Sequence, residues 1–88
     1  MPCYTTTPKF NKAFASLDEK EQRRTAKSLR QLDVNPRHPS LHLGKLEGTF
    51  YCTIRVELNF RVALRDLGEG QYELVDIGNH DYIYRVYG

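Results

Sequence analysis

At 88 residues, the chain is long enough for one hydrophobic core and too short for two, so we expect one domain spanning residues 1–88. Its hydrophobic share of 40% and charged share of 27% are those of an ordinary globular protein. The formal net charge of +2 is too small to indicate nucleic-acid binding by itself. The placement of the basic residues must therefore decide that question.

Cysteine and histidine usage argues against a disulfide scaffold and against a zinc site. Cys3 and Cys52 are too few for a disulfide framework, and we expect buried free thiols. The three histidines, His38, His42 and His80, lack the spacing of metal ligands. The N-terminus has no signal-peptide pattern, and no apolar run approaches about 20 residues. We therefore expect a cytoplasmic protein without a membrane span.

The first residues predict a short strand followed by a helix. Residues 3–6 are rich in β-branched and aromatic side chains, which favours a strand. Thr7 and Pro8 form a helix start, because threonine caps a helix and proline is tolerated at its first position. The apolar residues that follow at helical spacing are Phe10, Ala13, Phe14 and Leu17.

A second helix is predicted to begin at Asp18, which forms a capping-box pattern with Glu21. It runs to about Asp33, because Asn35 precedes a proline and is pushed out of the helical region. The basic residues expected on its outer face are Lys20, Arg23, Arg24, Lys27 and Arg30. Residues 35–48 are predicted to form a loop.

Three strand-like runs then follow, over residues 51–57, 59–64 and 71–77. Leu58 and Asn59 predict a tight connection, and residues 68–70 predict a looser hairpin. The resulting fold class is α+β, in the order β-α-α-β-β-β. In this fold a helical hairpin packs on one face of a mostly antiparallel sheet.

Strand alternation places two arginines on one face of that sheet. If the helices cover the face of Ile54 and Val62, then Arg55 and Arg61 lie on the opposite, open face. The side chains expected to reach the same face from beyond the third strand are His80 and Tyr84. Two fixed cations, an imidazole and a phenol suit phosphate chemistry.

A structural interpretation of the same residues is the simpler one from spacing alone. Arg55 and Arg61 would then be solvated sheet residues that pair with Glu57, Glu73 or Asp76. His80 would be a turn residue whose ring bonds to the backbone. The tyrosines that would close the edge of the core or meet a partner are Tyr82, Tyr84 and Tyr87.

Five short motifs accompany this order of elements: Leu41-x-x-x-Lys45-Leu-Glu-Gly48, Ile54-Arg-Val56, Asn59-Phe-Arg-Val62, Asp76-Ile-Gly-Asn-His-Asp81 and Ile83-Tyr-Arg85. Together, the motifs and the order of elements resemble the RelE/ParE superfamily of toxins. The resemblance implies the RelE/ParE-like fold and a type II toxin that is held inactive, in a hetero-oligomer, by a cognate antitoxin. In the RelE branch it implies a metal-independent endoribonuclease that needs no cofactor, cleaves mRNA on the ribosome and so inhibits translation. In the ParE branch it implies a non-enzymatic DNA gyrase poison.

The resemblance also implies roles for individual residues. Arg61 matches an arginine that contacts the scissile phosphate, and Arg55 matches a catalytic basic residue on the preceding strand. Thr53 falls where a second basic residue is common, so the sequence departs from the pattern there. The remaining matches are His80 for proton transfer and Tyr84, or alternatively Tyr82, for stacking on a base. The residues expected to contact RNA are Lys45, Arg55, Arg61, Tyr82 and Arg85.

The required chemistry agrees with the RelE branch. Metal-free RNA cleavage uses the ribose 2′-hydroxyl as nucleophile, so the protein must move protons and stabilise a phosphorane. Arginines supply the electrostatic stabilisation, and an unperturbed histidine pKa of about 6.5 suits either proton transfer. We therefore predict an mRNA-cleaving toxin with Arg61, Arg55, His80 and Tyr84 as catalytic residues. The alternatives are a gyrase poison and an inactive relative that only binds its antitoxin.

Overall fold

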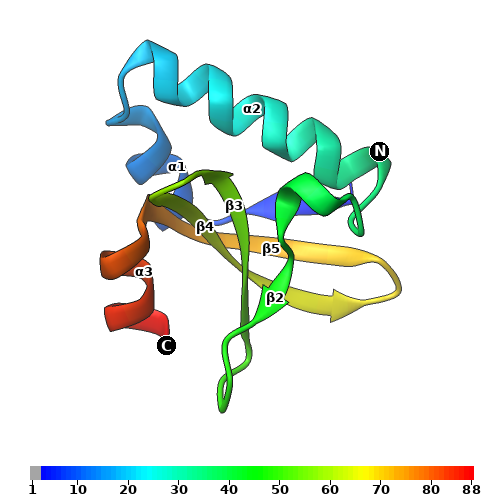
Figure 1. Ribbon diagram of the computed structural model, residues 1–88. Helices are drawn as coiled ribbons and strands as arrows, with labels where there is room; N and C mark the ends of the chain where they lie inside the picture. Colours follow the sequence, from blue (N-terminus) through cyan, green and yellow to red (C-terminus); the bar gives the residue numbers. More distant parts are fainter. Residues whose placement is uncertain (1–2) are drawn as a thin grey trace.

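The computed structural model describes residues 3–88. Its elements in chain order are β1 (Tyr4–Thr6), α1 (Pro8–Ala15), α2 (Glu19–Val34), the 3-10 helix η1 (Pro39–Leu41), β2 (Gly44–Lys45), β3 (Tyr51–Glu57), β4 (Phe60–Gly68), β5 (Gln71–Asn79) and α3 (His80–Tyr87). The sheet has the strand order β1-β5-β4-β3-β2 (Figure 1). β1 pairs with β5 in parallel, and the other pairs are antiparallel. The predicted α+β fold with a mostly antiparallel sheet is confirmed.

The helical hairpin begins at the residues that the capping patterns predict. The Thr7 side chain accepts a hydrogen bond from the Phe10 N–H at 3.1 Å. The Asp18 carboxylate accepts one from the Glu21 N–H at 2.8 Å. Each cap satisfies a backbone donor that would otherwise lack a partner within the helix.

The main hydrophobic core lies between this hairpin and one face of the sheet. Phe10, Leu29 and Leu32 from the helices pack in one cluster with Ile54 and Val62 from the strands. Cys3 and Cys52 are free thiols that lie half-buried at the margin of this core, rather than fully buried as predicted. Within residues 3–88, no helix combines the length and apolar character needed to cross a bilayer.

Three parts of the predicted order are wrong. The expected loop over residues 35–48 contains η1 and β2, and the last strand continues through Gly78 to Asn79. The hairpin before that strand is tight, because Gly68 pairs with Gln71 across Glu69 and Gly70. Glu69 and Gly70 both have positive φ angles, which suit a two-residue hairpin turn.

The largest difference from the predicted order is α3, a C-terminal helix where no helix is predicted. It packs on the sheet face opposite the hairpin, and Figure 1 shows it at the lower left in orange and red. Its buried Ile83 and Tyr87 form a second core with Leu46 and Ala63. The face that was expected to be open is therefore partly covered.

Candidate functional site

α3 begins at the end of β5 because Asn79 caps it. The Asn79 side chain accepts a hydrogen bond from the Tyr82 N–H at 2.8 Å. Ile83 and Tyr87 lie one helical turn apart, so both side chains are on the face of α3 that packs on the sheet. His80 and Tyr84 also lie one turn apart, so a short, firmly docked helix fixes both.

The turn between β3 and β4 brings Arg61 close to His80. The Arg61 guanidinium donates through Nη1 to the carbonyl oxygens of Glu57, Leu58 and Phe60, at 2.8, 3.0 and 3.1 Å. The fourth carbonyl of this turn, that of Asn59, accepts the His80 backbone N–H at 2.7 Å. One turn of four residues therefore holds both a fixed cation and the first residue of α3.

The His80 imidazole stacks on the phenol of Tyr84. Their ring centroids are 4.1 Å apart, with an angle of 18° between the ring planes. Tyr84 is 41% exposed, so this flat surface is open to solvent. Nδ1 of His80 lies 3.4 Å from a carboxylate oxygen of Asp81, a long contact on a side chain that is otherwise exposed.

Arg55 lies next to Arg61 but also borders a second feature of the surface. Its Cα pairs with that of Arg61 across β3 and β4, so the two arginines are direct neighbours. The register shifts between Arg55 and Glu57, however, and Arg55 also borders a hollow next to α2. Arg55 therefore lies at the edge of the sheet, next to Arg61 and next to the hollow, and its placement wholly on the face away from the hairpin stays a prediction.

The carboxylates that the simpler interpretation assigns to the two arginines have other partners. Glu57 pairs with Arg24, Glu73 with Arg65 and Asp76 with Lys9. Within residues 3–88, neither Arg55 nor Arg61 forms an ion pair with a carboxylate. Two arginines whose charge is not balanced by a neighbouring carboxylate are suited to bind an anion.

The other predicted RNA contacts are more scattered. Lys45 is exposed on β2, where it pairs with Cys52, and Arg85 is exposed in the last turn of α3. Tyr82 is half-buried, and its ring covers Gly78, where a Cβ atom would come within 2.6 Å of Tyr82 Cδ2. Of the two tyrosines considered for base stacking, Tyr84 is therefore the accessible one.

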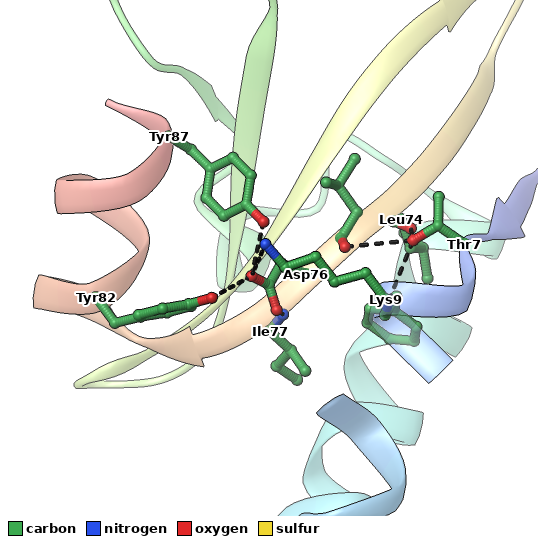
Figure 2. A network of polar contacts seen from close by, with 9 residues as sticks. Thr7, Lys9, Leu74, Asp76, Ile77, Tyr82 and Tyr87 are labelled. Atoms are coloured by element: carbon green, nitrogen blue, oxygen red, sulfur yellow. Dashed lines mark hydrogen bonds and ion pairs between the residues drawn. The ribbon is translucent and has the colours of Figure 1, made fainter. Parts of the chain in front are cut away.

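A buried carboxylate that was not predicted as a site residue anchors α3. Asp76 is 2% exposed, and its Oδ2 accepts hydrogen bonds from the Tyr82 and Tyr87 hydroxyls at 2.6 and 2.7 Å (Figure 2). Lys9 Nζ lies 3.5 Å from the same oxygen, and the Ile77 N–H donates to Oδ1 at 2.8 Å. This Asp76 network joins α1, β5 and α3.

The network explains the charge state of its members. Burial alone would raise the pKa of Asp76, but the hydrogen bonds from Tyr82, Tyr87 and the Ile77 N–H, with the charge of Lys9, lower it below its usual value. Burial and then the hydrogen bond to Asp76 raise the pKa of Tyr87. The ionised carboxylate is therefore part of the folded structure near neutral pH.

A β-bulge turns Asp76 toward α3. Ala63 pairs with Asp76 whereas Leu64 pairs with Leu74, which leaves Val75 as the extra residue of β5. One signal for the network was present in the sequence, namely a lone aspartate in the apolar run from Leu74 to Ile77. Within the described residues, no group of three or more histidine, cysteine or acidic side chains is placed to hold a metal ion.

The fold, with the helical hairpin on one face of the sheet and α3 on the other, is similar to that of solved toxin structures. A YoeB/ParE toxin from Agrobacterium tumefaciens superposes with a TM-score of 0.71, at 17% identity over 88% of this chain and 96% of that one. A chain of the RelB–RelE antitoxin–toxin complex from Methanococcus jannaschii gives 0.66, at 16% identity over 94% and 98%. A chain of the Escherichia coli DinJ–YafQ complex gives 0.65, at 13% identity over 96% and 99%. No protein-family model matches the sequence, and no curated protein matches it.

Proposed function

We propose that this protein is the toxin of a type II toxin–antitoxin pair and acts as a metal-independent endoribonuclease on mRNA. The observation that carries the proposal is the β3–β4 turn, whose carbonyl groups accept the Arg61 guanidinium and the backbone N–H of His80. The His80 ring in turn stacks on the exposed ring of Tyr84. A cation without a carboxylate partner, an imidazole and an exposed aromatic ring are what cleavage of a single-stranded RNA requires.

In this mechanism the protein supplies no nucleophile. The ribose 2′-hydroxyl attacks the adjacent phosphorus, its proton is removed, and the 5′-oxygen leaves as it is protonated. Arg61 stabilises the negative charge that develops on the phosphoryl oxygens, and Arg55 assists from the neighbouring strand. His80 takes one of the two proton-transfer roles, because an imidazole can both accept and donate a proton.

The observed hydrogen bonds of Arg61 are compatible with this role. All three of its contacts to the β3–β4 turn use Nη1. In the part of the chain that the structure describes, Nη2 and Nε make no hydrogen bond, so both can donate to a phosphate. The turn thus fixes the guanidinium plane in advance of substrate binding, which lowers the cost of ordering it.

Tyr84 stacks on a base beside the cut, and its partner His80 is held at the same surface. The predicted RNA contacts of Lys45, Tyr82 and Arg85 remain part of this proposal, with Tyr82 the least accessible of the three. The partners we propose are a cognate antitoxin, mRNA and the ribosome, in the cytoplasm. The antitoxin is supported by the RelB–RelE and DinJ–YafQ complexes, each of which contains a chain with a similar fold.

The proposal is tested by primer extension on a defined message, with purified protein and with or without ribosomes. Arg61→Ala is compared with Arg30→Ala, since Arg30 is an exposed arginine on α2 away from the turn. We expect discrete cleavage ends with the parent and with Arg30→Ala, and none with Arg61→Ala. Intact messages together with a DNA-damage response in cells that express the parent would refute nuclease action and indicate gyrase poisoning.

A further inference from the structure

A hollow of about 460 Å³ lies between α2 and the edge of β3, on the other side of Arg55 from the candidate site. β2 pairs with β3 at Thr53 and Cys52, and beyond these residues β3 runs along the hollow as an edge strand. Its lining side chains come from α2, the segment around η1 and β3: Arg24, Lys27, Gln31, His38, Arg55 and Glu57. A volume in this range holds a small ligand or a nucleotide.

The lining is rich in hydrogen-bond donors and in positive charge. Arg24, Lys27 and Arg55 are fixed cations, and the only carboxylate among the lining residues, that of Glu57, is already paired with Arg24. Positive charge therefore exceeds negative charge around the hollow, and an anion would be its favoured occupant.

His38 adds a further donor. Its Nδ1 accepts a hydrogen bond from the Ser40 backbone N–H at 3.2 Å, and a backbone amide can only donate. In the neutral imidazole the proton must then reside on Nε2, which makes that nitrogen a donor. The Ser40 hydroxyl lies 2.8 Å from the same Nδ1 and holds the ring in place.

Arg55 connects the hollow to the candidate site. It lines the hollow, and its Cα is the direct cross-strand partner of that of Arg61. Directly opposed residues on neighbouring strands lie about 5 Å apart. A chain of phosphates that reaches Arg61 can therefore continue past Arg55 into the hollow without leaving the protein surface.

We propose that the hollow between α2 and β3 is a phosphate-binding subsite for the RNA strand next to the cleaved bond. The inference rests on the proposed function, because it assigns an RNA strand to the same surface. Lys27 is its key residue. It contributes a point charge to a phosphate at the hollow and takes no part in cleavage.

The test measures binding of a fluorescent 2′-O-methyl RNA of about eight nucleotides, a length within the range of single-strand binding sites. This RNA lacks the attacking hydroxyl, so binding is observed without cleavage. Lys27→Gln is compared with Lys20→Gln, since both lysines are exposed on α2 and Lys20 does not line the hollow. Dissociation constants are measured at several salt concentrations.

We expect Lys27→Gln to weaken binding about 3- to 10-fold at low salt, and to reduce the slope of log K against log salt by about 0.7, the value for one phosphate contact on a single strand. Lys20→Gln should leave both quantities close to those of the parent. Equal behaviour of the two variants, or no binding of the RNA by the parent at low salt, would overturn the proposal.

Binding of a polyglutamate peptide with the same net charge as the RNA distinguishes an RNA partner from an acidic protein partner. We expect it to bind more weakly than the RNA and to be insensitive to Lys27→Gln. If it binds as tightly as the RNA and loses affinity equally in Lys27→Gln, the hollow takes an acidic segment and the RNA subsite is refuted. A parent protein that binds the RNA through Lys27 but never cuts a message would contradict the nuclease and leave the subsite standing.

Discussion

Asp76→Asn tests the anchoring of α3 most directly. Asparagine preserves the shape of the side chain but removes its negative charge. Two tyrosine hydroxyls donate hydrogen bonds to this charged group, and Lys9 forms an ion pair with it. Hydrogen bonds to a charged group are worth about 1.5–3 kcal/mol each, whereas neutral ones contribute about 0.5–1.5. Weakening two such bonds at a side chain that is only 2% exposed should lower the free energy of unfolding by about 2–4 kcal/mol.

This loss is a large fraction of the total, because a domain of this size is stabilised by roughly 5–10 kcal/mol. In thermal unfolding it corresponds to a decrease in Tm of at least about 8 °C, since each 1 kcal/mol is worth about 4–8 °C in a domain of this length. Asp66→Asn is the matched control. Asp66 is exposed and accepts the Gly68 N–H in a hairpin, a hydrogen bond that asparagine can also accept.

The pH dependence gives a second measurement. Since the pKa of Asp76 is lowered in the folded state, its charge contributes stability above the unfolded pKa of about 3.9, and this stability is lost as the pH falls through the folded pKa. The difference between the parent and Asp76→Asn should therefore be constant near neutral pH and shrink below about pH 4. Urea unfolding of both variants between pH 7 and pH 3 measures it. Equal stability of Asp76→Asn and Asp66→Asn at pH 7 would refute the anchoring role.

Three further predictions concern the candidate site. Arg61→Ala should lower the single-turnover cleavage rate by at least about 10²-fold, and an unchanged rate would show that Arg61 is not part of the site. It should also lower the free energy of unfolding in urea by about 1–2 kcal/mol, because three turn carbonyls lose their donor. His80→Gln should reduce the single-turnover cleavage rate by about 10²–10⁴-fold, while the affinity for a 2′-O-methyl RNA stays the same. Parallel losses in rate and affinity would instead indicate that His80 contacts the substrate without transferring a proton. Gly78→Ala should destabilise the protein by about 1–3 kcal/mol, because the new Cβ would lie 2.6 Å from Tyr82 Cδ2. In the control Gly44→Ala, the atom nearest to the new Cβ is 3.7 Å away. Thermal unfolding compares the two variants, and equal Tm values would contradict the packing of Tyr82 on Gly78.

Local patterns in the sequence were sufficient for the helical hairpin and most of the sheet. Thr7 and Asp18 cap helices because each side chain bonds to a backbone N–H three residues ahead, an interaction that depends on neighbouring residues alone. The alternation of Ile54 with Arg55 likewise follows from the strand geometry itself. Such features need no knowledge of distant parts of the chain.

α3 could not be predicted in this way. Five of its eight residues are β-branched or aromatic, which favours a strand, and a helix this short is unstable by itself. It forms because Ile83 and Tyr87 dock on Ala63 and Leu46, contacts that exist only once the sheet is assembled.

The composition of the candidate site also depends on the tertiary structure. Proximity of Arg61 and His80 requires that β5 returns alongside β4, so that both reach the carbonyl groups of one turn. The bulge at Val75 decides that Asp76 faces α3, and the packing of α2 beside β3 creates the hollow that Arg55 borders. Side-chain identity specifies which groups are available for chemistry, but strand pairing and register determine which of them meet, because these join residues far apart in the chain.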